Sequence, residues 1–214
     1  MPSLDSITFD TTGLIPQGDK NGVRVWQTPD GNNGLGLYYF PIPPDILADI
    51  NSLESVSSFY GNGIAQASNI TGVSIGTMDL DDCKCIKMII KVTQQPSGMG
   101  YIGSLTLPFR DFSFVVKMQC AERGLTGMRE SFVVDELMGK GEIKIDKSGK
   151  FEGWEKPSIS SSSDVWKINR AEAVEYDERF PNHPLSVLRR TFSQIEKTIK
   201  ISDDVKQEPK FSYP

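Results

Sequence analysis

Apolar and polar residues alternate most regularly in the middle of the chain. Every second residue is apolar or small from 101 to 107, and the alternation resumes from 112 to 120 after a short turn. A period of two is typical of a strand with one face against a core. In the turn, Pro108 fixes one φ angle and Asp111 offers a side-chain acceptor to nearby backbone amides. The pattern therefore predicts a β-hairpin over 101–120.

A helix is predicted directly after this hairpin, over 128–138. Thr126 stands where its hydroxyl can cap the first amides, and glycines follow the last periodic position. The apolar residues expected to face the core are Met128, Phe132, Val133 and Leu137. We also predict that Arg129 satisfies loop carbonyls near the start of this helix, because its guanidinium presents a fork of N–H donors.

Two further hairpins are predicted on the same grounds. The first joins 23–26 to 35–39, and the second joins 70–78 to 86–92 through the acidic turn 79–82. We expect this turn to be solvated, because it lacks the carboxylate spacing and the glycine of a calcium loop. The preceding residues 1–20 predict only a lead-in strand or loop.

Helical spacing of apolar residues recurs in two other segments. Over 45–60 the apolar positions are Ile46, Ile50, Leu53, Val56 and Tyr60. Over 184–200 they are Leu185, Leu188, Phe192, Ile195 and Ile199. Both patterns predict amphipathic helices with one stripe on a core. His183 precedes the second helix, where a capping hydrogen bond explains it better than catalysis does.

These elements predict an α+β fold. An antiparallel sheet of about six strands, joined mainly by hairpins, is expected to pack with two to three helices in a layered sandwich. We assign 1–155 to the sandwich core, 156–164 to a serine-rich loop or linker, 165–202 to a C-terminal helical region that packs on the core, and 203–214 to a disordered tail.

Composition narrows the classes of function. The chain has 214 residues, 38% of them hydrophobic and 24% charged, which is ordinary for a globular domain. A net charge of −5 disfavours nucleic acid as a partner, since phosphate backbones select for clustered Lys and Arg. The sequence has no apolar run of the length of a signal peptide or a membrane span, so membrane insertion is not expected. The odd count of cysteines, Cys83, Cys85 and Cys120, predicts reduced structural thiols and a cytoplasmic location.

No cofactor and no metal site is predicted. The only cluster of potential ligands along the sequence is Glu172, Glu175, Asp177 and Glu178 with His183. A solvated acidic helix explains four nearby carboxylates better than a divalent metal does, because acidic proteins commonly carry such surface segments.

The order of elements resembles that of the Mog1/PsbP-like (DcrB-like) fold group. The resemblance rests on the hairpin VRVWQTPDGNNGLGLYYF, the helix after PPDI and the strands that end at Gln119. It covers about 23–138, and it extends to 185–199. It implies a layered sandwich and a non-catalytic accessory or binding module, since members of that group are similar to adaptors and assembly factors. The serine-rich segment and the C-terminal region depart from the pattern.

Two hypotheses of function follow. The favoured one is a non-catalytic adaptor or assembly protein that recognises a protein partner, because the sequence has no catalytic constellation. Its candidate binding residues are Trp26, Tyr38, Phe40, Tyr101 and Arg129. The alternative is a carboxylate-dependent hydrolase or lyase that uses Asp111, Glu122 and Glu130.

Alternation within the first hairpin gives the binding hypothesis a geometric basis. Tyr39 must face away from Tyr38 and Phe40, so one of the two sets points away from the first core. That set must be covered by a helix of this chain, a second chain or a ligand.

Overall fold

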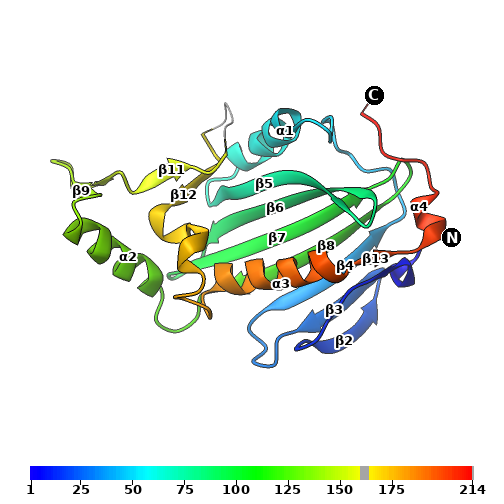
Figure 1. Ribbon diagram of the computed structural model, residues 1–214, viewed down its shortest axis with the longest axis horizontal. Coiled ribbons are helices and arrows are strands. Elements are labelled where there is room, and N and C mark those ends of the chain that lie inside the picture. Colours follow the sequence, from blue (N-terminus) through cyan, green and yellow to red (C-terminus); the bar gives the residue numbers. More distant parts are fainter. Residues whose placement is uncertain (160–163, 214) are drawn as a thin grey trace.

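The computed structural model describes residues 1–159 and 164–213. Its largest element is a seven-stranded sheet of order β2-β3-β4-β8-β7-β6-β5, in which every neighbouring pair is antiparallel (Figure 1). The strands are β2 Ile15–Lys20, β3 Val23–Gln27, β4 Gly34–Phe40, β5 Ile70–Leu80, β6 Cys83–Thr93, β7 Met99–Pro108 and β8 Ser113–Ala121. The helices are α1 Leu53–Ala65, α2 Met128–Gly139, α3 Pro184–Thr198 and α4 Asp203–Lys206.

Short elements complete the described chain. The short strand pairs are β1 Ile7–Thr8 with β13 Lys200–Ile201, β9 Lys144–Ile145 with β10 Phe151–Glu152, and β11 Glu155–Pro157 with β12 Lys167–Asn169. The 3₁₀ turns are η1 Leu4–Ser6, η2 Arg170–Glu172 and η3 Val174–Tyr176. None of the helices in the described residues is both long and apolar enough to cross a membrane.

The predicted α+β class with an antiparallel sheet is confirmed, as are the three hairpins. The sheet has one strand more than expected, because β2 reads IPQGDK and all six of its residues are exposed. A strand at the edge of a sheet, with no core to face, carries no alternation of apolar residues, so the pattern over 1–20 did not distinguish a strand from a loop.

One face of the sheet is buried under α3, which lies across β7 and β8 (Figure 1). The residues of β7 and β8 on this face are fully or almost fully buried: Tyr101, Leu105, Leu107, Phe114, Val116, Met118 and Cys120. Gly103 sits directly beneath the helix, where an added Cβ would lie 2.7 Å from Phe192 and 2.8 Å from Leu188. The lack of a side chain at this position therefore allows α3 to approach the sheet.

The opposite face is covered by α1 over the β5–β6 end of the sheet. The predicted start of this helix at residue 45 is wrong, because the helix begins at Leu53, after a cap in which Ser52 Oγ accepts from Ser55 N–H. Asp49 accepts from the amide of Asn51, and this local turn competes with helix. Ile46 and Ile50 are nonetheless buried, so the apolar pattern indicated the core correctly and the backbone incorrectly.

The other helical predictions hold in part. On α2, Val133 and Leu137 are buried as predicted, whereas Met128 and Phe132 are exposed. They are exposed because α2 packs on η2 rather than on the sheet. The helix predicted over 184–200 ends at Thr198, and His183 caps it as predicted, since His183 Nδ1 accepts from Leu185 N–H at 3.3 Å.

The C-terminal segment is more ordered than predicted. Of the residues assigned to a disordered tail, 203–206 form α4, and Val205 is fully buried. Asp81 fixes this segment, because its carboxylate accepts from Ile201 N–H at 2.7 Å and pairs with Lys206 at 2.8 Å. Of the predicted linker 156–164, residues 160–163 lie outside the described part, and Lys156 and Pro157 belong to β11. The three cysteines are buried and free, as predicted.

A methyl group at Gly103 should force α3 away from the sheet. We expect Gly103→Ala to lower the free energy of unfolding by about 1–3 kcal/mol, the usual cost of overpacking a core, as measured by denaturant unfolding. Gly76→Ala on β5 is the control, because an added Cβ there has nothing within 4 Å. Equal effects of the two substitutions would contradict the proposed contact.

The contacts of Asp81 with Ile201 and Lys206 should make the free energy of unfolding depend on pH in the acid range. Hydrogen bonds from Ile201 N–H and Lys206 lower the pKa of Asp81 to about 2. A carboxylate with a depressed folded-state pKa stabilises the fold above its unfolded pKa, near 3.8, and loses this contribution as the pH falls toward 2. We expect Asp81→Asn to cost roughly 1.5–3 kcal/mol at pH 7. This cost should shrink as the pH falls through about 2, where the folded-state carboxylate becomes protonated. Asn tolerates the positive φ at this position, 45°, and Asp79→Asn in the same turn is the control.

Candidate functional site

The first turn of α2 is held by a carboxylate from the preceding connection. The predicted cap Thr126 is wrong, because the N-cap position is Gly127, with φ of 73° and no side-chain cap. Instead Glu122 accepts from Gly127 N–H at 3.0 Å and from Met99 N–H at 2.8 Å. Glu122 therefore ties the N-terminus of α2 to the start of β7.

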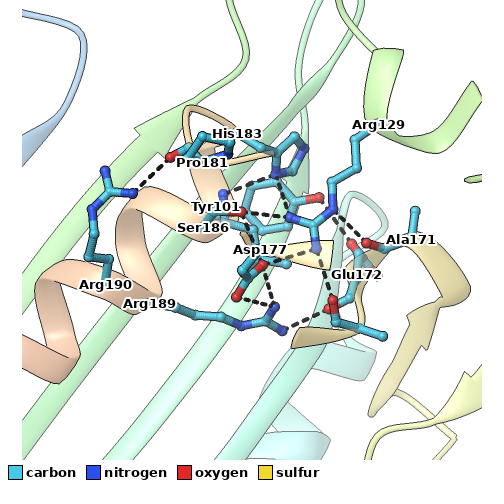
Figure 2. Close-up of polar contacts among 12 residues, drawn as sticks. Tyr101, Arg129, Ala171, Glu172, Asp177, Pro181, His183, Ser186, Arg189 and Arg190 are labelled. Atoms are coloured by element: carbon cyan, nitrogen blue, oxygen red, sulfur yellow. Dashed lines mark hydrogen bonds and ion pairs between the residues drawn. The ribbon is translucent and has the colours of Figure 1, made fainter. Parts of the chain in front are cut away.

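Arg129 is the central residue of a buried polar network that joins α2 to the segment before α3 (Figure 2). Its side chain is 1% exposed. The guanidinium contacts are Ala171 O at 2.6 Å, Ser186 Oγ at 2.8 Å, Ala173 O and Asp177 Oδ1 at 3.0 Å, and His183 Nδ1 at 3.4 Å. Each N–H of the fork thus has a partner. Two partners are backbone carbonyls, but the predicted location of these carbonyls is wrong, because they belong to Ala171 and Ala173 and not to the turn near the start of α2.

Two of the acidic residues expected in a solvated helix belong to this network. Glu172 is fully buried, pairs with Lys91 Nζ at 2.8 Å and accepts from the Tyr101 hydroxyl at 3.1 Å. Asp177 pairs with both Arg129 and Arg189. The predicted solvated helix is therefore wrong for these two residues, because cations from distant parts of the chain compensate their burial. The segment itself forms the 3₁₀ turns η2 and η3.

His183 is neutral and its tautomer is defined. Burial, followed by the charge of Arg129, lowers the pKa of His183 to about 4. Nδ1 faces two donors, Leu185 N–H and Arg129 Nη1, so it must be an acceptor. The ring proton therefore sits on Nε2, which points toward Glu122 Oε1 at 3.8 Å.

Three potential metal ligands converge here. Oxygen or nitrogen atoms of Glu122, Glu130 and His183 lie within 4.8 Å of one another. Because Nε2 of His183 carries the proton, this nitrogen has no lone pair to offer, and Nδ1 cannot take the proton while it faces two donors. The donor set therefore does not fit a divalent metal, and we assign none.

A cleft of about 720 Å³ opens beside this network. Its walls come from the β3–β4 turn, the connection between β8 and α2, and residues 180–184. Glu122, Arg129 and His183 line its inner end. Of the predicted catalytic carboxylates, the structure brings Glu122 and Glu130 together here, whereas Asp111 lies at the opposite end of β8, exposed and paired with Arg110.

A second candidate surface is the uncovered part of the sheet, on the face opposite α3. Along β3, β4, β8 and β7, alternation and register place a set of partly or largely exposed residues on this face, whereas Pro108 and Ser113 at one end of it are buried. We call this set the open sheet face: Val23, Val25, Tyr38, Phe40, Ile102, Ser104, Thr106, Val115, Lys117 and Gln119.

The predicted binding residues divide between the interior and this surface. Trp26, Tyr101 and Arg129 are buried, so their contacts are internal. Tyr38 and Phe40 lie on the open sheet face. Their rings are stacked with centroids 6.1 Å apart, and Phe40 is 42% exposed. Only these two of the five present accessible side chains to a partner.

Removal of the Arg129 side chain should leave buried acceptors without donors. We expect Arg129→Ala to lower the free energy of unfolding by about 3–5 kcal/mol, the usual cost of breaking a buried ion pair, as measured by denaturant unfolding. Arg129→Lys should recover only part of this, because an ammonium cannot reproduce the planar fork. The control is Arg190→Ala, an exposed arginine that donates to Pro181 O. A loss below about 1 kcal/mol in Arg129→Ala would contradict the assigned role.

No model of a known protein family matches the chain, and no curated protein matches it. Among solved structures, it is similar to the Ran-binding protein Mog1p of Saccharomyces cerevisiae, at 9% identity and a TM-score of 0.48, over 94% of this chain and 92% of that one. It is also similar to PsbP of Synechocystis sp. PCC 6803, at 14% identity and a TM-score of 0.37, over 64% and 85% of the two chains. A protein of Bacteroides thetaiotaomicron matches at 7% identity and a TM-score of 0.36, over 58% of this chain and 41% of that one. Since Mog1p and PsbP give the Mog1/PsbP-like group its name, the predicted resemblance is confirmed to that extent.

Proposed function

We propose that the protein binds an amphipathic helix of a partner protein on the open sheet face. The observation that carries this proposal is the unequal cover of the sheet. Its α3 face is buried along β7 and β8, whereas α1 covers the opposite face only at β5 and β6. Layered folds bury both faces of such a sheet, so an apolar surface left open favours cover from a second molecule.

The dimensions of the open sheet face suit one helix. It spans four strands, and at about 4.8 Å between neighbours the outer two are about 14 Å apart. A helix with its side chains is about 10–12 Å wide and would lie beside α1. The chemistry also suits it, because Lys117 is the one charged side chain among apolar and small polar neighbours. A partner helix with an apolar stripe and one facing carboxylate would complement this surface.

The edges of the sheet favour binding to the face over addition of a strand. At one edge, β2 contains Pro16 and a bulge between Pro16 and Gly18, both of which hinder pairing with another strand. At the other edge, Gly72 N–H of β5 already donates to Val165 O, and Trp166 bridges to the same strand.

The carboxylate hydrolase or lyase is the less supported hypothesis. Asp111 is remote from Glu122 and Glu130, so the three do not form one site. Both oxygens of Glu122 accept backbone hydrogen bonds, and Oε2 of Glu130 is sealed from solvent. A catalytic acid or base must reach the proton that it transfers. Glu122 lines the cleft, but backbone amides already occupy both of its oxygens, and Glu130 is not among the residues that line the cleft.

Substitution of one residue on the open sheet face should weaken helix binding. A peptide-display library of helix-forming sequences, selected on the protein, should yield peptides with apolar residues at helical spacing and an acidic residue among them. In fluorescence anisotropy, we expect Val115→Glu to raise the Kd of these peptides at least tenfold, because an unpaired carboxylate would be buried at the interface.

Val174→Glu is the matched control, since Val174 is apolar and 70% exposed on η3. It should leave the Kd within about twofold, and circular dichroism should show both variants folded. Peptides without an apolar stripe, or equal binding to Val115→Glu, would overturn the proposal. Self-association that Val115→Glu abolishes would instead assign the surface to a second copy of the chain.

A further inference from the structure

Two carboxyl groups meet where α2 joins the sheet, and they are in unequal surroundings. Glu122 is 8% exposed at its side chain, and its oxygens accept from the amides of Met99 and Gly127. Oε2 of Glu130 is buried and has no hydrogen-bond partner among the described residues. Two backbone amides of other residues donate to Glu122, whereas only its own backbone amide and the charge of Arg129 oppose the effect of burial at Glu130.

The cations near this pair are already engaged. Arg129 pairs with Asp177, and Lys91 pairs with Glu172. His183 is neutral and directs Nε2 toward Glu122. The Tyr101 hydroxyl donates to Glu172 and carries no charge, because burial raises its pKa. The described groups from β6, β7, η2, α2 and α3 therefore supply no unpaired buried cation for a second carboxylate, and Arg123, which follows Glu122, is exposed to solvent.

We propose that Glu122 and Glu130 together hold one proton, carried by Glu130, and that loss of this proton releases the connection 123–127 and the first turn of α2 from β7. Two adjacent buried carboxylates cannot both ionise without repulsion. We expect the repulsion to displace the connection 123–127. This connection is mostly exposed, and it is held by the hydrogen bonds that Glu122 accepts from Gly127 and Met99.

The release would change the cleft, because this connection forms one of its walls. Arg123, Leu125 and Met128 line the cleft and are exposed. Proton loss would move these side chains away from 180–184 and widen the cleft. The protein would then present two shapes of this surface, selected by pH.

The direction of the pH dependence is fixed by the surroundings of Glu130. Burial first, then the charges of Glu122 and Glu172, raise the pKa of Glu130 above its ordinary value of 4.5. The folded state therefore holds this proton more tightly than the unfolded chain does. Stability contributed by the protonated form is present below pH 4.5 and is lost as the pH rises through the raised pKa.

Amide hydrogen exchange tests the proposal directly. After correction for the intrinsic pH dependence of exchange, protection of the Met99 and Gly127 amides should fall at least tenfold between pH 4.5 and pH 8. In Glu130→Gln, which is neutral at every pH, protection should stay constant. The control Asp135→Asn, one turn further along α2 and exposed, should behave as the wild type does.

Parallel behaviour of Glu130→Gln and the wild type would overturn the proposal, as would constant protection in the wild type. If Glu130→Gln does not fold, carboxyl-carbon NMR of the wild-type protein decides instead. A buried Glu that titrates above 4.5 together with the Gly127 amide supports the shared proton. The absence of any Glu titrating above 4.5 refutes it.

Discussion

The burial of one guanidinium joins α2 to the two 3₁₀ turns and to the start of α3. An arginine taken out of water must find an acceptor for each N–H, and Arg129 finds them on η2, on the loop before η3, on η3's C-terminal neighbour Asp177 and at the start of α3. None of these segments pairs with another as strands do. Among the described residues, Arg129 is the one side chain that contacts all of them, Arg189 adds bonds to Glu172 O and Asp177, and Arg129 also lines the cleft.

A glycine has a different role on each of the two faces of the sheet. Under α3, a glycine lets the helix approach closely and the neighbouring strand residues are buried. On the other face, Gly36 has a different use: an added Cβ would lie 2.7 Å from the ring of Tyr38, so this ring lies along the strand instead of projecting from it. Tyr38 and Phe40 therefore form a flat aromatic surface, a shape that suits a rod-like partner.

The strands were predictable because each of the central ones faces a core on one side, which imposes a period of two on the sequence. The start of α1 was not, since Ile46 and Ile50 are buried whether or not the backbone is helical. The polar network was beyond sequence reasoning, because Arg129 and Ala171 are 42 residues apart and Lys91 and Glu172 are 81 apart. Glu130 was singled out as a carboxylate near a turn, but its lack of partners depends on the fold. Only the capping position of His183 gave a local signal.

The position of Trp166 allows the packing of α1 on the sheet to be followed by tryptophan fluorescence. Its indole is 1% exposed, covers Gly72 of β5 and donates from Nε1 to Ser57 O of α1 at 3.0 Å. A buried indole with an engaged N–H emits at short wavelength, and water that reaches it shifts the emission to the red. The fluorescence of this residue is therefore coupled to the junction between α1 and the sheet, and α1 borders the open sheet face. The protein carries its own optical reporter beside that surface.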